Sequence, residues 1–319
     1  MLRLAHRLLR GSVLSAMIPP FFLDCVIAIG LSISQQGAPT RVQWQASGFL
    51  VGQAVEEQKG QYRIFAVTCA HVINNLRDAV NQAKRHARSR TFVTPLARFN
   101  PMPGSVAQEY PIHLDKFKTD EATDVAVAEI NVPVLKQRGI SNLAFFPSDQ
   151  AVADRAKAND LGLSEGDGVY VLGFPLGLVE LGKHNYVIVR SGTIARIRDE
   201  LNEEQPMFLI DSFSFPGNSG GPVISKPEPF AISGTKAHGT SYLIGMIHGY
   251  VPYEDIAVSE QTLRPRVIFE ENSGLAEVIP IDYVNDLIET VVASAPKPTA
   301  SSSPCKARSV AGSKRSASN

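Results

Sequence analysis

The chain has 319 residues, of which 44% are hydrophobic and 19% are charged, as is ordinary for a soluble globular protein. The 31 basic and 31 acidic side chains balance, so no overall basic field indicates a nucleic acid or a membrane surface as the main partner. The three cysteines, Cys25, Cys69 and Cys305, are widely spaced, which argues against a disulfide framework and against a cysteine-built zinc site.

The N-terminal segment has features of a targeting sequence. Residues 1–23 contain no acid, and three arginines precede an apolar stretch that begins at Val13. A proline pair interrupts this stretch and no small-residue cleavage site follows, and the same features argue against a membrane-spanning helix. We therefore predict an extension over 1–16 and a first strand at FFLDCVIAIG, residues 21–30. A cytoplasmic location is expected, with export or organelle targeting through 1–23 as the alternative.

Short apolar runs separated by glycine and proline dominate the rest of the chain. Many short strands with such punctuation favour antiparallel sandwiches or barrels over an alternating α/β fold. The stretch LSEGDG, residues 163–168, separates two groups of runs. The first group contains ASGFLVGQ, YRIFAVTCAHVI, RTFVTPLARF and TDVAVAEI, and the second contains GVYVLGFPLG, YVIVRSGTIARI, MFLIDSF, GGPVIS and SYLIGMIHGY. Long loops are expected at 225–241 and 251–275.

Helical patterns are confined to residues 74–88 and 281–294. The second has an apolar stripe suited to packing on a sheet, made of Val284, Leu287, Ile288, Val291 and Val292. From 296 to 319 the sequence is rich in serine, proline, lysine and arginine and contains no acid. Such a segment buries too little apolar surface to fold, so we predict a disordered tail with solvated charges.

The stretch SFPGNSGGPV, residues 214–223, surrounds Ser219 with three glycines, which permit a tight turn or a close approach of the backbone to a reactive group. A serine hydroxyl becomes a nucleophile only when a base takes its proton and a third group orients that base. His71, at the end of the predicted strand IFAVTCAH, is the candidate base, with His113 and His248 as weaker competitors. Asp124 precedes VAVAEI and suits the orienting carboxylate, since an acid at a strand start is partly buried.

The motifs TCAHV, TDVAVAEI and PGNSGGPV, in this order, resemble those of chymotrypsin-fold serine peptidases, most closely the catalytic module of Deg/Htr-type proteases. Four more segments of this sequence resemble parts of that branch: VLGFPLGL, RSGTIARI, LIGMIHG and VIPIDYVNDLIE. The resemblance covers about residues 21–294. Too few residues follow 294 for the PDZ domain common in that branch, so none is expected.

This resemblance implies an all-β peptidase domain at about 17–295 with two antiparallel six-stranded β-barrels. The first barrel is expected over about 17–150 and the second over about 165–280, with a C-terminal helix at 281–294. The active site is expected in the cleft between the barrels.

The resemblance also implies a role for each candidate residue. Ser219 corresponds to the nucleophile, His71 to the general base and Asp124 to the orienting carboxylate, and the backbone N–H groups of Gly217 and Ser219 correspond to the oxyanion hole. No metal or organic cofactor is implied.

Substrate contacts follow from the same resemblance. His248, Gly249 and Tyr250 correspond to the strand that lines the substrate cleft. Phe213, six residues before Ser219, corresponds to the base of the primary specificity pocket, where an aromatic ring favours small or medium apolar side chains over unpaired cations. The implied partners are protein or peptide substrates.

The expected reaction is hydrolysis of peptide bonds through an acyl-enzyme on Ser219. Trypsin-like zymogens carry, directly before the nucleophile, an aspartate that pairs with a newly cut N-terminus. Asn218 occupies that position here, so we predict that no proteolytic activation is needed. Two alternatives remain open: a catalytically silent trypsin-like scaffold that binds proteins, and an esterase that uses the same triad.

Overall fold

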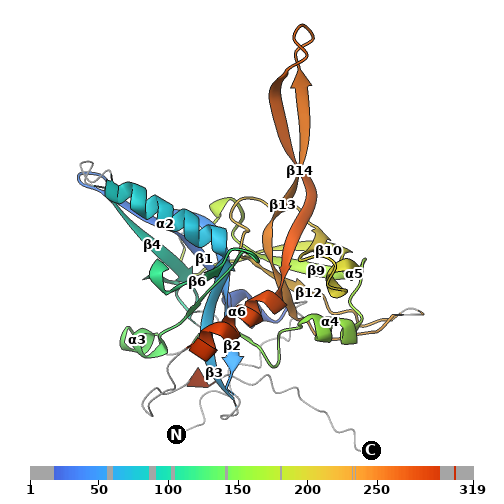
Figure 1. Ribbon diagram of the computed structural model, residues 1–319. Coiled ribbons are helices and arrows are strands. Elements are labelled where there is room, and N and C mark those ends of the chain that lie inside the picture. Colours follow the sequence, from blue (N-terminus) through green and yellow to red (C-terminus); the bar gives the residue numbers. More distant parts are fainter. Residues whose placement is uncertain are drawn as a thin grey trace, which may run out of the picture.

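The computed structural model describes residues 18–55, 60–85, 91–101, 105–140, 143–179, 182–231, 233, 235–294 and 305–306. In these residues, antiparallel strands form two units that pack side by side, with few helices (Figure 1). The predicted all-β architecture of two antiparallel units with a C-terminal helix is confirmed. The elements in chain order are α1 (Pro20–Asp24), β1 (Val26–Gln35), β2 (Arg41–Ala54), β3 (Gln61–Cys69), α2 (Ala70–Arg85), β4 (Thr91–Phe99), β5 (Gln108–Pro111), the 3-10 helix η2 (Leu114–Lys116), β6 (Lys118–Asp120), β7 (Val125–Glu129), α3 (Val132–Gln137), β8 (Phe146–Pro147), α4 (Arg155–Leu161), β9 (Gly168–Gly173), the 3-10 helix η3 (Pro175–Gly177), β10 (Ile188–Arg196), α5 (Arg198–Leu201), β11 (Phe208–Asp211), β12 (Pro222–Ser225), β13 (Leu243–Val258), β14 (Pro265–Pro280), α6 (Ile281–Ser294) and β15 (Cys305–Lys306).

The first unit is a nine-stranded sheet whose main path runs β5-β4-β1-β2-β3-β7-β6. Two further strands of two residues each, β8 and β15, pair with β2 and β3. The rings of Phe49, Phe65 and Phe146 are fully buried in this unit, where edge-to-face packing adds to the apolar area removed from water. These buried strands hold the histidine and the aspartate of the candidate site at their ends.

The second unit is a closed barrel in the order β10-β11-β14-β13-β12-β9. Alternate residues of its strands point inward, as the two-residue period of a strand requires, and the interior contains Val169, Val171, Ile194, Ile210 and Ile247. Helix α6 packs its predicted apolar stripe against β7 of the first unit and β13 of the second. This helix therefore ties together the two units between which the candidate site lies.

Two local predictions are wrong. The predicted first strand, residues 21–30, begins with helix α1, and the strand starts only at Val26. Pro20 at the first helical position favours this start, because its fixed φ angle suits a helix and its missing N–H would be unpaired there. The strand predicted to end at His71 ends at Cys69, and His71 lies in the first turn of α2. A short apolar run does not distinguish a strand from a buried helix, and the start of α2 is buried through Val72, Ile73 and Leu76.

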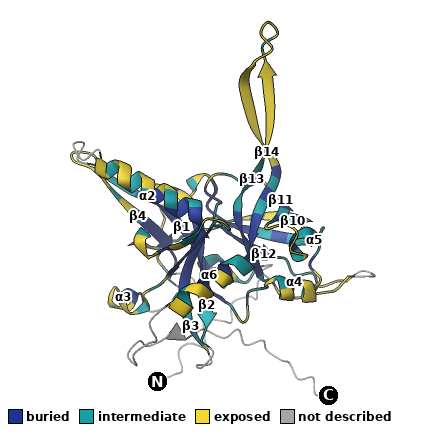
Figure 2. Cartoon of the chain, viewed as in Figure 1, coloured by how far each residue is buried: buried dark blue, intermediate teal, exposed yellow. Residues whose placement is uncertain are grey.

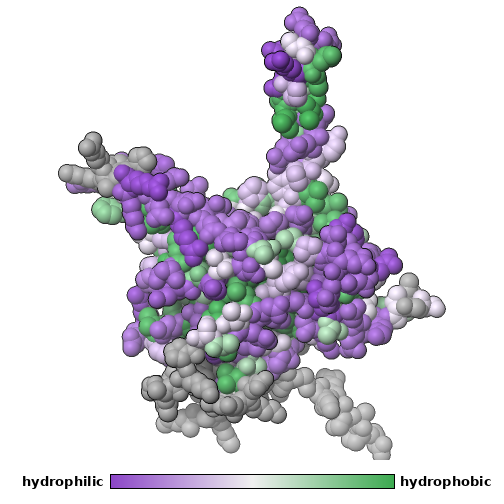
Figure 3. Space-filling model, viewed as in Figure 1, coloured by the Kyte–Doolittle hydropathy of each residue, from purple (hydrophilic) through white to green (hydrophobic). Residues whose placement is uncertain are grey.

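The segment 251–275, which was expected to be a loop, forms strands instead. Its residues form the outer halves of β13 and β14, a two-stranded arm that projects away from the body of the protein (Figure 1). Nearly all of its residues are exposed (Figure 2), and apolar groups lie among the polar ones along it (Figure 3). The segment 225–241 contains no strand beyond Ser225 in its described residues, as expected of a loop.

The terminal predictions fall largely outside the described residues. The predicted extension 1–16 lies outside them, and so does the predicted tail 296–319 apart from Cys305–Lys306, which pairs with Gln61 and Tyr62 of β3. Among the helices that the structure describes, none has the length and apolar character needed to cross a membrane.

Candidate active site

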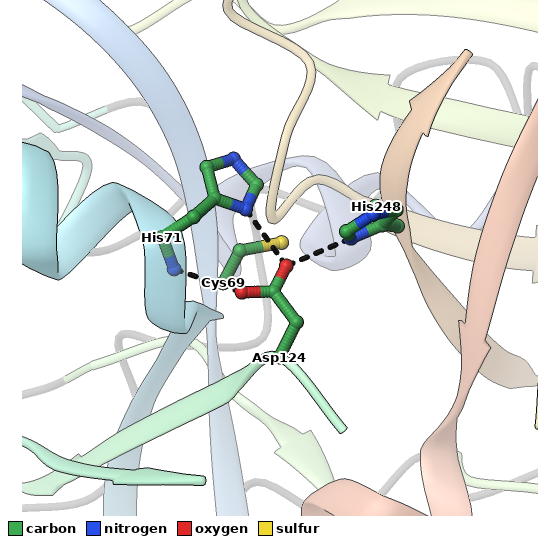
Figure 4. A group of neighbouring side chains, drawn as sticks. All are labelled: Cys69, His71, Asp124 and His248. Atoms are coloured by element: carbon green, nitrogen blue, oxygen red, sulfur yellow. Dashed lines mark hydrogen bonds and ion pairs between the residues drawn. The ribbon is translucent and has the colours of Figure 1, made fainter. Parts of the chain in front are cut away.

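The site is organised around the carboxylate of Asp124, which directly precedes β7. The φ angle of Asp124 is 55°, a left-handed conformation that aspartate and asparagine tolerate better than most residues. Asp124 Oδ1 accepts a hydrogen bond from the backbone N–H of His71 at 2.8 Å, and Oδ2 lies 2.7 Å from His71 Nδ1 (Figure 4). The acid thus serves as a cap for the N-terminus of α2 and also sets the orientation of the imidazole.

This geometry suits a general base. A proton on Nδ1 of His71, shared with Asp124, leaves Nε2 free to accept a proton from a substrate or a hydroxyl. Burial opposes the charged form of Asp124, but hydrogen bonds from His248 and His71 outweigh burial and hold the pKa of Asp124 well below its usual range. The carboxylate is therefore ionised at neutral pH and can stabilise an imidazolium.

Ser219 lies in the turn between β11 and β12, on the second unit. It lines a cleft of about 420 Å³ together with His71, so the structure places the candidate nucleophile and base in one cavity. The Ser219 hydroxyl donates to the backbone carbonyl of His248 at 3.1 Å. To transfer its proton to His71, the hydroxyl must give up this hydrogen bond.

The backbone around Ser219 leaves two N–H groups without acceptors. Leu176 N–H donates to the carbonyl of Pro216 at 2.6 Å, and because the peptide is trans, the N–H of Gly217 points the opposite way. Neither this N–H nor that of Ser219 has an acceptor among the described residues. Gly217 has a φ of 101°, and a Cβ there would lie 2.4 Å from the Phe174 carbonyl oxygen. The position therefore requires glycine, and the two free donors suit a developing oxyanion.

Ser47 holds this turn in place, a role that the sequence analysis missed. Its buried hydroxyl donates to the Gly217 carbonyl at 2.7 Å and accepts from Phe174 N–H at 2.9 Å. Its backbone N–H donates to the Ser219 carbonyl at 3.0 Å, so one residue of β2 fixes both sides of the nucleophile. The only feature of the sequence that could have indicated this role is a serine next to a glycine inside an apolar strand.

His248 occupies a position that the sequence analysis assigned to substrate contact. It lines the cleft with Gly249 and Tyr250, but its Nδ1 also lies 2.8 Å from the same Asp124 oxygen that contacts His71. The two imidazole rings meet edge to face with centroids 5.7 Å apart. The hydrogen bond to Asp124 raises the pKa of His248 despite its burial, and Glu277, 4.0 Å from Nε2, adds to this effect. Two histidines therefore share one carboxylate.

Replacing His248 with glutamine is expected to change the acid limb of the pH profile of kcat/KM. The hydrogen bond to Asp124 raises the pKa of His248, so its positive charge beside the cluster persists to higher pH and is lost as the pH rises through that pKa. Glutamine offers a hydrogen bond to Asp124 without the charge, so this ionisation disappears from the profile. The exposed His113, which lies outside the cleft, provides the control His113→Gln. An unchanged limb in the His248→Gln protein would show that the two rings are not coupled.

Cys69, His71, Asp124 and His248 also form a group of possible metal ligands, whose donor atoms lie within 4.8 Å of one another (Figure 4). The contacts do not fit a metal site. Both imidazoles already share protons with one Asp124 oxygen at hydrogen-bond distances, and the Cys69 thiol donates to the Ile247 carbonyl. Burial, with the nearby charge of Asp124, raises the pKa of the Cys69 thiol well above its usual value, whereas metal binding requires the thiolate. The group is better described as a hydrogen-bonded acid–base cluster.

Three predicted site residues lie outside the residues lining the cleft: Asp124 and Gly217, which contact residues of the lining or adjoin them, and Phe213. Phe213 is half exposed, its ring stacks on that of Phe215 with centroids 6.4 Å apart, and it lies against Gly274. The assignment of Phe213 to a specificity pocket stays a prediction. The cleft lining also contains residues that the sequence analysis did not select: Ser214, Phe215, Pro216, Pro252 and Glu270.

Similarity to a known domain family agrees with this geometry. No curated protein matches this chain. Among solved structures, the human heparin binding protein aligns with a TM-score of 0.42 and 11% sequence identity, covering 89% of this chain and 98% of that chain. The model of the trypsin-like peptidase domain matches residues 46–228, more than half of the chain, and this span includes His71, Asp124 and Ser219. With its closed six-stranded barrel and second antiparallel sheet, the chain has the predicted chymotrypsin-like fold and belongs to the trypsin-like peptidase family.

Proposed function

We propose that this protein is a serine endopeptidase that cleaves protein or peptide substrates through an acyl-enzyme on Ser219. The observation that carries the proposal is a single cleft with three features. It contains a serine hydroxyl and an imidazole oriented by an ionised carboxylate, and the turn that carries the serine has two backbone N–H groups without acceptors among the described residues. Within the trypsin-like family, the motifs quoted above favour a relation to the Deg/Htr branch.

In the proposed mechanism, His71 Nε2 takes the proton of Ser219 as Oγ attacks the carbonyl carbon of the scissile bond. The resulting oxyanion accepts hydrogen bonds from the N–H groups of Gly217 and Ser219. His71 then gives its proton to the leaving amine, and the C–N bond breaks. Water repeats the sequence on the acyl-enzyme ester, with His71 again as base and then as acid. Asp124 remains ionised throughout and holds the imidazole in one tautomer.

The cleft suits an extended polypeptide. β13 pairs with β12 only through Leu243, Gly245 and Met246, so residues 248–250 have no partner strand from β12 beside the cleft. A substrate chain can add to such an edge through backbone hydrogen bonds, with Gly249 allowing close approach. Phe215 and Pro216 give the cleft lining an apolar character, which favours apolar substrate side chains.

Asn218, the residue directly before the nucleophile, is relevant to whether the chain must be cut to become active. Its side chain is buried, and neither of its polar atoms has a hydrogen-bond partner among the described residues. An uncharged amide does not form an ion pair with a newly cut N-terminus. We therefore propose that the uncut chain carries a competent site.

One observation favours the silent-scaffold alternative: the Ser219 hydroxyl donates to a carbonyl rather than to His71. Catalytic hydrogen bonds are often long or misaligned without substrate, so this contact alone does not distinguish the two functions. An esterase would use the same groups.

A fluorophosphonate probe tests the proposal, because it reacts only with an activated serine. We expect labelling of the intact, full-length protein and none of the Ser219→Ala and His71→Ala proteins. No labelling of the intact protein would favour the scaffold. Labelling that requires a new N-terminus, and disappears when that terminus is acetylated, would contradict activation without cleavage. A peptide-library digest then separates a peptidase from an esterase.

A further inference from the structure

The two strands of the projecting arm, residues 252–272, pair with each other and with no other strand of the described chain. Their pairs, from Pro252 with Asn272 to Val258 with Pro265, join the outer half of β13 to the outer half of β14. The pairs that join these strands to the barrel end at Met246 of β13, opposite Pro222 of β12, and at Leu275 of β14, opposite Asp211 of β11. The arm exposes seven large apolar side chains: Tyr253, Ile256, Val258, Leu263, Val267, Ile268 and Phe269.

Such an arm is physically unusual. An isolated two-stranded hairpin is at best marginally stable in water, and exposed apolar groups gathered on one element indicate a surface that binds something. Figure 3 shows apolar groups along the arm well away from the body. The arm has two faces, and their residues differ in how they relate to the active-site cleft.

One face of the arm is continuous with the active-site cleft. Glu270 lines the cleft, and Tyr250, another cleft residue, donates its hydroxyl proton to Glu270 Oε1 at 2.6 Å. Glu254 is directly opposite Glu270, and directly opposite residues share a face of a hairpin. Ile256 and Ile268, opposite each other and two positions further out, share that face by the strand period. We name Glu254, Ile256, Ile268 and Glu270 the cleft face.

The residues that alternate with these make the back face. Tyr253 is opposite Glu271, and Ala257 is opposite Val267, both pairs on the side of the hairpin away from the cleft face. This face provides residues of the same types for comparison, since it also carries a glutamate and apolar side chains.

The charges on the cleft face need a cation. Like charges directly opposite each other destabilise a strand pair, and no ion pair joins Glu254 or Glu270 to a basic group among the described residues. The whole arm carries five acidic and two basic side chains. A lysine or arginine from outside would relieve the repulsion between the two glutamates, and an apolar side chain next to it would cover Ile256 and Ile268.

We propose that the cleft face is a docking track for the substrate polypeptide, which lies along the arm as an extended segment. A basic substrate side chain binds between Glu254 and Glu270, and an apolar one binds against Ile256 and Ile268. The proposal rests on the proposed peptidase function and specifies its substrates. At ~3.3 Å per strand residue, Ile256 lies ~20 Å beyond Tyr250, so a substrate needs about six further residues to reach it. Glu270 lines the cleft but Glu254, Ile256 and Ile268 do not, so short peptides that fill only the cleft do not reach these three residues.

A matched pair of charge reversals tests the track. Glu254→Lys is on the cleft face, and Glu271→Lys makes the same change on the back face of the same arm. We expect Glu254→Lys to lower kcat/KM for β-casein, a disordered polypeptide, about tenfold, mainly through KM. Glu271→Lys is expected to change it less than twofold. Both variants should cleave a short peptide substrate as the unaltered protein does. Ile256→Ser with Ile268→Ser, compared with Ala257→Ser with Val267→Ser, repeats the test on apolar contacts.

Equal loss of β-casein cleavage from both faces, or an equal loss with the short peptide, would overturn the proposal. Light scattering identifies the main rival, since a dimer that dissociates in the Ile256→Ser, Ile268→Ser protein would make the arm an interface between copies of this chain. Binding of fluorescein-labelled β-casein to the Ser219→Ala protein requires no catalysis. If Glu254→Lys weakens that binding and Glu271→Lys does not, docking holds even where phosphonate labelling has failed. If neither weakens it, docking fails while the proposed peptidase function stands.

Discussion

Ser219→Ala is expected to lower turnover by about 10⁶-fold, to the level left by the remaining groups, while the fold stays intact. The hydroxyl makes one hydrogen bond, to the His248 carbonyl, and this bond is dispensable to the turn. The turn is held through the backbone, by Ser47 N–H on the Ser219 carbonyl and by Gly220 N–H on the Ile247 carbonyl. Alanine keeps all of these contacts. The measurement is kcat/KM on a peptide substrate together with a thermal melt.

The control for this substitution is Ser191→Ala, on the exposed surface of the second unit, where the hydroxyl accepts a hydrogen bond from Lys226. This change should leave kcat/KM within about twofold. If the Ser219→Ala protein kept more than about one hundredth of the activity, Ser219 would not be the nucleophile. Loss of the cooperative thermal transition would instead show that the hydroxyl has a structural role.

Asp124→Asn is expected to lower kcat by about 10⁴-fold. The carboxylate accepts from His71 N–H, His71 Nδ1 and His248 Nδ1, and an amide has one oxygen for these donors. Its NH₂ group would donate to His71 Nδ1, place the proton on Nε2 and so leave the base unable to accept from Ser219. Asparagine tolerates the left-handed φ of 55° as well as aspartate does. The loss of kcat therefore comes from the missing charge and the wrong imidazole tautomer rather than from backbone strain.

The depressed pKa of Asp124 also predicts how stability depends on pH. A carboxyl group whose pKa is lower in the folded than in the unfolded protein stabilises the fold above its ordinary pKa of 3.8, and this contribution is lost as the pH falls toward the folded value. The Asp124→Asn protein should therefore lose less stability than the unaltered protein on acidification below about pH 4, as thermal melts would measure. Asp120→Asn is the control, because this residue is in the same turn and its carboxylate accepts hydrogen bonds from Ala122 and Thr123 rather than from the two histidines. An equal effect from Asp120→Asn would point to the turn rather than to the site.

Much of this architecture could be read from local features of the chain. Alternating apolar residues in TDVAVAEI and the Gly-rich punctuation specify short strands, because side-chain period and turn chemistry act over a few neighbouring residues. The stripe at 281–294 specified α6 for the same reason. The glycines around Ser219 indicated a constrained turn, since a positive φ and a close approach of two backbones are demands that glycine meets at its own position.

Other features depend on contacts between residues far apart in the chain. His248 and Asp124 are 124 positions apart, and Ser47 and Gly217 are 170 positions apart. No sequence feature near any of these residues indicates the hydrogen bond that joins each pair. The arm is a similar case: its apolar and charged residues have strand character, but whether such a strand is covered depends on which elements pack beside it. Local propensity and period act along the chain, whereas shared carboxylates, fixed turns and uncovered strands arise only when distant segments come together in space.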